Sequence, residues 1–368
     1  MPVTKKFAVG YYFHPNNFVS LVSPYLSYLT EVYFPLPGIA SAREIGGEEK
    51  ALRNQLVQDL QALRVQGLKL DLLINSSCYG EKAYSSEFRH EIEDAIKYLD
   101  DNGVKPDVVT TTSLFVARVV KMKYPEIDNR ASVNLKIGST VAMEYIDDIF
   151  DSLYMRRELQ RDIPTVLHFR QWCDEHHKKL CMLVNSGCIQ NCPAQMFHEN
   201  LVAHGFWRAF NESYRLNSGV SLCWEIFHNR QMYEEVLRGA WIRPEDVHIY
   251  EPYIDVFKLS TRDEVLNADL ILKAYTSGDY DGNLLELLDP NFTPEFHNYY
   301  IDNKSFPENW VTSQIAGKCA NMCTRCGKCT AILQRVLKKF PEQQIPMEAK
   351  FSFSADNLSI GSYSFVNG

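Results

Sequence analysis

The chain has 368 residues, of which 45% are hydrophobic and 23% are charged, and its formal net charge is −8. This balance is typical of a folded protein with a large core, and it disfavours broad binding to the phosphate backbone of nucleic acids, which needs a basic surface. The sequence contains no run of about 18 apolar residues, so we expect no transmembrane helix.

Short apolar runs alternate along the chain with longer segments of helical periodicity. Helical segments follow most of the apolar runs, and Gly67 and Gly103 end two of them. The expected strands are 7–12, 31–37, 69–77, 107–113, 130–136, 152–159, 179–186 and 254–261. The expected helices are 18–29, 48–67, 87–103, 114–125, 140–149, 163–178 and 263–278. A long excursion separates the last two strands.

Repeated strand–helix units of this kind predict an α/β fold, a (β/α)8 TIM-like barrel with a cysteine-rich C-terminal extension. The expected strands are almost continuously apolar, as parallel strands covered on both faces should be. A doubly wound open sheet is the alternative fold. We expect the barrel at residues 1–285, the extension at 286–335 and a weakly structured tail at 336–368.

A barrel of this type places its active site at the carboxyl ends of the strands, which form its mouth. The cations and amides expected there would suit an anionic ligand such as a carboxylate or phosphate, although many of them could instead cap helices or pair with surface acids. The candidates that follow or end the expected strands are His14, Asn16, Arg43, Asn75, Cys78, Thr111, Ser113, Asn134, Lys136, Arg156, Arg157, Glu158, Asn185, Cys188, Lys258 and Arg262.

Cysteines are concentrated in two segments. The segment CANMCTRCGKC carries Cys319, Cys323, Cys326 and Cys329, and LVNSGCIQNCP carries Cys188 and Cys192. The N-terminal residues lack the apolar run and cleavage site of a signal peptide, so we expect a reducing, cytoplasmic location. Close thiols in that setting indicate a metal site and not a disulfide framework, with an iron–sulfur cluster or zinc as the metal group.

The mouth should gather one set of thiols. Cys188 and Cys192 follow the seventh strand, Cys78 follows the third, and Cys223 lies about 30 residues beyond the pair. Together they would complete a four-thiolate site for a [4Fe–4S] cluster. Cys78 and Cys223 could instead be ordinary buried thiols, and we expect Cys173 and Cys181 to belong to the core.

The second set is the run from Cys319 to Cys329. Four cysteines this close rarely enclose one cubane cluster alone, so the run could bind a second cluster through three ligands or donate one or more to the cluster at the mouth. A structural zinc site is the alternative, because tetrahedral Zn²⁺ also accepts four thiolates.

The order of several short motifs resembles the U32 peptidase family. The carriers are VNLK in the fifth unit, REL (157–159) in the sixth, the Gly187–Cys188 step after the seventh, DVFKLSTR in the eighth and AYTSGDYDG beyond it, over roughly residues 130–285. The chain departs from the family where Leu259, Ser260 and Thr261 replace its usual Ile-Glu-Gly, and it lacks the ELLAPAG-like opening.

The resemblance implies a barrel that carries a four-cysteine [4Fe–4S] cluster. Several branches of the family look like oxygen-independent hydroxylases that act on small organic precursors or RNA bases, which implies a small-molecule or nucleoside substrate and a homologous partner subunit. The family name implies a peptidase instead, and a third possibility is a non-catalytic binding protein. The sequence itself has no HExxH or G-x-S-x-G motif that would supply a peptidase mechanism.

Four charged residues complete the predicted site: Arg157, Glu158, Lys258 and Arg262. Their cations would orient a carboxylate-bearing substrate beside the cluster, and Glu158 would be the nearest acid or base. The alternative is that all four form a structural ring of ion pairs around the top of the barrel.

Overall fold

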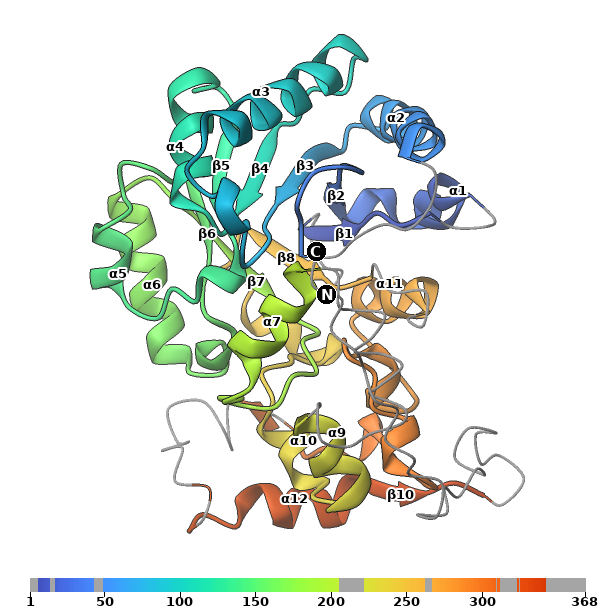
Figure 1. Ribbon diagram of the computed structural model, residues 1–368. Helices are drawn as coiled ribbons and strands as arrows, with labels where there is room; N and C mark the ends of the chain where they lie inside the picture. The colour runs from blue at the N-terminus through green and yellow to red at the C-terminus, as the bar shows by residue number, and fades with distance from the viewer. Residues whose placement is uncertain are drawn as a thin grey trace, which may run out of the picture.

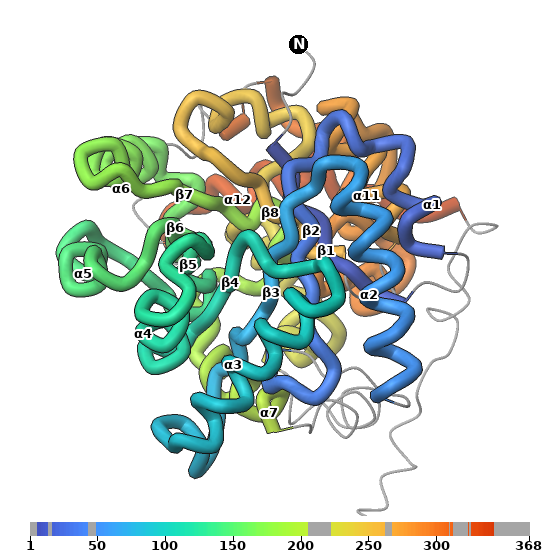
Figure 2. Tube along the Cα trace, turned by 90° about the horizontal axis from the view of Figure 1, so that it is seen from above, coloured from blue at the N-terminus to red at the C-terminus, as the bar shows by residue number. Residues whose placement is uncertain are grey.

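A computed structural model describes residues 6–13, 17–42, 49–204, 222–261, 267–308, 310–311, 323 and 325–341. Its centre is a closed barrel of eight parallel strands, each paired with its neighbours in chain order and β8 paired with β1. Figure 2 shows helices α2 to α6 and α11 around the outside of this ring of strands. The predicted (β/α)8 barrel is therefore confirmed, and the open sheet is wrong.

The eight barrel strands are short. They are β1 (Phe7–Gly10), β2 (Leu29–Pro35), β3 (Lys69–Ile74), β4 (Val108–Thr111), β5 (Asp128–Ala131), β6 (Ser152–Tyr154), β7 (Lys179–Leu183) and β8 (Val256–Leu259). The sequence pattern extended most of them too far, because the polar segments that follow leave the ladder and turn into loops at the mouth.

Helices cover the barrel, occupy the excursion between β7 and β8, and continue into the C-terminal extension. They are α1 (Phe18–Val22), α2 (Glu49–Val65), α3 (Ser86–Asp101), α4 (Leu114–Lys123), α5 (Thr140–Glu144), α6 (Ile163–Glu175), α7 (Gln195–Ala203), α9 (Leu222–Trp224), α10 (Glu234–Arg238), α11 (Ala268–Ser277) and α12 (Lys328–Val336). No helix in these described ranges combines the length and apolar character needed to cross a membrane.

Local signals in the sequence fix several helix ends. The side chains of Ser85 and Ser113 accept hydrogen bonds from the first turns of α3 and α4. Gly67 and Gly103 follow α2 and α3 with φ of 83° and 73°, a conformation that glycine adopts without strain. The serines thus start α3 and α4, and the glycines form the turns that lead into β3 and β4.

The excursion and the C-terminal extension pack on each other below the barrel, as Figure 1 shows for α9, α10 and α12. Phe292 and Phe296 are buried against Phe227, with ring centroids 4.6 and 5.4 Å apart, and Trp310 stacks on Trp241 at 6.0 Å. Strand β10 (Leu337–Lys339) pairs with β9 (Tyr299–Ile301). Ordered structure therefore continues past residue 335, where we expected the tail to begin.

Candidate functional site

Arg157 lies at the mouth of the barrel, in the short 3-10 helix η4 (Arg157–Leu159) that follows β6. Its Nη1 donates to Ser186 Oγ at 3.3 Å and lies 3.4 Å from Cys188 Sγ, and its Nη2 donates to Glu199 at 3.3 Å. Burial lowers the pKa of Arg157, but the negative groups around it, led by Cys188, outweigh burial and raise it overall. Arg157 is thus a permanently charged residue beside a thiol.

The loop that carries Cys188 is held firmly. The Asn185 side chain donates to the carbonyls of Ser260 and Leu287, each at 3.0 Å, and the Gly187 N–H donates to the Asp289 carbonyl at 2.8 Å. A Cβ on Gly187 would lie 2.4 Å from the carbonyl oxygen of Pro290. Only glycine fits so close an approach, so this loop position fixes the backbone immediately before Cys188.

Cys192 lies in the same loop and is half-buried. Burial raises the pKa of its thiol and Cys188 raises it further, while N–H groups at the start of α7 oppose both. The metal site that the sequence predicted for these two thiols stays a prediction. Their separation by three residues places them on one loop with Arg157 alongside.

Helix α7 carries Glu199, a site residue that no motif in the sequence indicated. One carboxylate oxygen of Glu199 forms an ion pair with Arg157. The other oxygen pairs with Lys136, at an N···O distance of 3.0 Å. Lys136 follows the 3-10 helix η3 (Val133–Leu135) after β5. The two cations come from different βα loops, and no sequence spacing links them to Glu199, so only the closed barrel brings the three together.

The other two cysteines predicted for the mouth lie on separate elements. Cys78 follows β3, and its sulfur accepts the Gly80 N–H at 3.4 Å. Cys223 lies on α9 and packs partly against the core. Within the ranges that the structure describes, no three His, Cys, Asp or Glu side chains come close enough to hold a metal ion. Cys188 and Cys192 share the loop between β7 and α7, and the predicted four-thiolate set stays a prediction.

The cysteine run near the C-terminus lies elsewhere. Cys323 and Cys329 both act electrostatically on Arg238 of α10, against which α12 packs, and Cys326 is exposed. Cys319 lies outside the described residues. Both views of the chain place α12 apart from α7 (Figures 1 and 2). The described part of this run is therefore separated from the thiols at the mouth.

The predicted charged set is not a single ring at the mouth. Glu158 pairs with Arg156, 3.0 Å away, and not with Arg157. Lys258 is buried inside the barrel, with its ammonium 3.8 Å from the centre of the Tyr33 ring. Arg262 lies outside the described residues. We placed Arg157, Glu158 and Lys258 at strand ends; the first two follow β6 in η4, and the third points inward from β8.

A buried ion cluster fills the barrel below the mouth. Arg130 of β5 donates through two nitrogens to Glu31 of β2, and it lies 3.6 Å from Asp71 of β3. Burial raises the pKa of Asp71 to about 6, with Glu31 adding to the shift and Arg130 and Lys258 opposing it. In the sequence, this cluster is indicated by a charged residue such as Asp71 inside an otherwise apolar strand. Such a residue in a barrel must find its partner on another strand.

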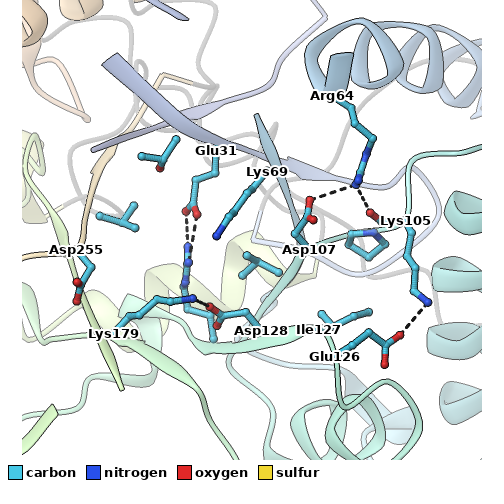
Figure 3. A pocket seen from close by; sticks show the side chains of 15 residues that line it. Glu31, Arg64, Lys69, Lys105, Asp107, Glu126, Ile127, Asp128, Lys179 and Asp255 are labelled. Carbon is cyan, nitrogen blue, oxygen red and sulfur yellow. Dashed lines mark hydrogen bonds and ion pairs between the residues drawn. The ribbon is translucent and has the colours of Figure 1, made fainter. Parts of the chain in front are cut away.

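A cavity of about 550 Å³ opens at the opposite, N-terminal end of the barrel. Figure 3 shows its charged walls, where Lys105 pairs with Glu126 at 2.8 Å and Arg64 with Asp107 at 3.2 Å. The buried pair of Arg130 and Glu31 lies at the same end. The acids here form ion pairs with neighbouring cations, and active sites of barrels of this type lie at the other end. We therefore interpret this cavity as structural.

The chain is similar to two known proteins, one in sequence and one in fold. The chain is 24% identical over 291 residues to an uncharacterized protease of Methanocaldococcus jannaschii, covering 77% of this chain and 81% of that protein. Its fold is similar to the solved structure of the U32 peptidase Mk0906, with a TM-score of 0.52 and 16% identity over 72% of this chain and 95% of that one. No protein-family model matches the sequence.

Proposed function

The sequence relative and the shared barrel fold support the U32 peptidase family, and from that premise we propose that this chain is an iron–sulfur enzyme that works at the mouth of its barrel. The reaction class that we propose is an oxygen-independent hydroxylation, or a related redox conversion, of a small organic or nucleoside substrate. A homologous partner subunit belongs to the same proposal.

The observation that carries the proposal is the contact between Arg157 and Cys188, 3.4 Å apart, with Cys192 on the same loop. The thiolate is the form of cysteine that binds metal. An N–H group directed at a ligand sulfur is also a typical outer-shell contact of iron–sulfur clusters, where it adjusts the reduction potential. Arg157, Cys188 and Cys192 would thus suit one side of a thiolate-bound metal group, and the further ligands would come from outside this loop.

Cys188 and Cys192 would hold a [4Fe–4S] cluster, with Cys78 and Cys223 as the proposed further ligands. When bound, the cluster would supply the redox-active or Lewis-acid centre. Arg157 and Lys136 would orient an anionic substrate beside it. Cys319, Cys323, Cys326 and Cys329 would form a separate site, for a second cluster or for zinc, because α12 lies apart from α7.

A peptidase is the second candidate, and the name of the sequence relative favours it. In that reaction Cys188 would act as the nucleophile, with the Arg157 guanidinium beside it. Such an enzyme depends on Cys188 but has no need of Cys192. The two candidates thus differ in their requirement for the second thiol.

Anaerobic purification followed by iron, sulfide and zinc analysis tests the proposal. An iron–sulfur enzyme should contain iron and acid-labile sulfide and absorb near 400 nm. A colourless, metal-free protein that cleaves peptides, and that loses this activity when Cys188 alone is replaced, would favour the peptidase.

A further inference from the structure

The carboxylate of Glu199 occupies a two-cation site at the mouth of the barrel. Arg157 Nη2 lies 3.3 Å from one of its oxygens and Lys136 Nζ lies 3.0 Å from the other. The side chains of Arg157 and Glu199 are only 12% and 16% exposed. Proteins commonly bind anionic ligands in this way, with a planar guanidinium on one side of the carboxylate and an ammonium on the other.

Helix α7, which carries this carboxylate, lies at the surface of the protein. No residue of α7 is buried, and Met196 and Phe197 are 68% and 58% exposed. The hydroxyl of Ser77 donates to the Glu199 carbonyl at 2.7 Å and to Asn200 at 3.2 Å. A nine-residue helix with no fully buried residue gains little free energy from packing, which favours its displacement by a ligand.

We propose that Glu199 is an internal stand-in for a substrate carboxylate, and that a carboxylate-bearing small molecule binds Arg157 and Lys136 by displacing Glu199 together with α7. This inference rests on the proposed function for the position of the site, and it adds the ligand class and an autoinhibitory contact. The bound carboxylate would lie next to Cys188, since Arg157 contacts both.

The displacement changes the observed affinity in a defined way. While Glu199 holds the cations, an incoming carboxylate binds only the fraction of molecules in which α7 is released, so its apparent affinity falls by that fraction. Replacing Glu199 with glutamine keeps the side-chain shape but removes the competing charge. The Glu199→Gln variant should therefore bind carboxylates more tightly than the wild-type protein.

The test uses the full chain, with succinate as the probe and calorimetry as the readout. Glu199→Gln should bind succinate at least about fivefold more tightly than the wild type. Glu93→Gln is the matched control, because Glu93 is also paired with two cations, Arg89 and Lys123, and is similarly buried, but it lies on α3. That variant should bind succinate as the wild type does. Equal or weaker binding by Glu199→Gln would overturn the proposal.

A second measurement needs no substitution. Saturating succinate should increase hydrogen exchange in residues 195–203 of the wild-type protein, because the ligand releases α7. Slower or unchanged exchange there, or no binding of succinate by either protein, would overturn the proposal. Inorganic phosphate serves as a second probe, and tighter binding of phosphate than of succinate would contradict the assignment to carboxylates. Metal content is measured separately, so failure of this inference is distinguishable from failure of the proposed function.

Discussion

Arg157 Nη1 lies 3.4 Å from Cys188 Sγ, so a largely covered guanidinium is in direct contact with a thiol at the mouth of the barrel. The same guanidinium reaches Glu199 on α7 through its other terminal nitrogen. One cation therefore joins the cysteine loop after β7 to the helix that follows it. Loss of that cation should affect both the metal-binding thiols and the anion site.

Replacing Arg157 with methionine should weaken metal binding about 10- to 100-fold, the usual cost of losing an outer-shell partner of a metal ligand. Iron retained during titration with a chelator measures the effect. Arg156→Met is the control, because Arg156 pairs with Glu158 and contacts no cysteine that the structure describes. Equal iron retention by the two variants would mean that Arg157 does not support the metal group.

Replacing Gly187 with alanine should destabilise the fold by about 1–3 kcal/mol, the typical cost of overpacking. The new Cβ would lie 2.4 Å from the Pro290 carbonyl oxygen and would push the Cys188 loop from its place. Gly138→Ala is the control, since its Cβ would meet nothing closer than 3.7 Å. Urea unfolding measures both. An unchanged midpoint for Gly187→Ala would show that the loop shifts at no cost.

Asp71 should make stability depend on pH. Burial raises its pKa from 3.8 to about 6, so between those values the folded state binds more protons than the unfolded state. Stability is then highest near pH 4 and falls as the pH rises to 6, by up to about 1.4 kcal/mol for each pH unit. Asp71→Asn should remove this slope in urea unfolding at pH 4 to 7. An identical slope in the variant would assign it to other groups.

The C-terminal cysteines should bind metal independently of the mouth. Replacing Cys323 and Cys329 with serine should lower the total metal content and leave the metal at the mouth in place, because α12 packs on α10 and lies apart from α7. Losing a structural metal should also cost several kcal/mol of local stability. Elemental analysis and thermal melting measure both effects. Unchanged metal content would remove this second site.

The sequence pattern was sufficient to predict the barrel, because apolar runs and helix caps are local signals. It predicted Cys188 and Cys192 at the mouth for the same reason, since they directly follow the seventh strand. It placed Arg157 and Glu158 on a strand, but β6 ends at Tyr154 and these residues turn into a 3-10 helix. An apolar run does not reveal where its hydrogen-bonded ladder stops.

Other features depend on which strands become neighbours across the barrel. Lys258 alternates inward on β8 and is covered by the Tyr33 ring, so its charge belongs to the buried cluster and not to the mouth. Glu199 meets Arg157 and Lys136 only because helix α7 and the segments after β5 and β6 converge. No spacing within the sequence encodes either contact, since each joins residues from separate βα units.

Iron and sulfide content after anaerobic purification tests the central claim most directly. The wild-type protein should contain a [4Fe–4S] cluster at the mouth, and replacing both Cys188 and Cys192 with alanine should remove it. Cys173→Ala is the control, because Cys173 lies on the buried face of α6 and burial raises the pKa of its thiol to about 12. The account predicts full iron and sulfide in the control and a loss of about four of each per chain in the double variant. Iron and sulfide that are equal in the wild type and the double variant, or absent from both, would contradict it.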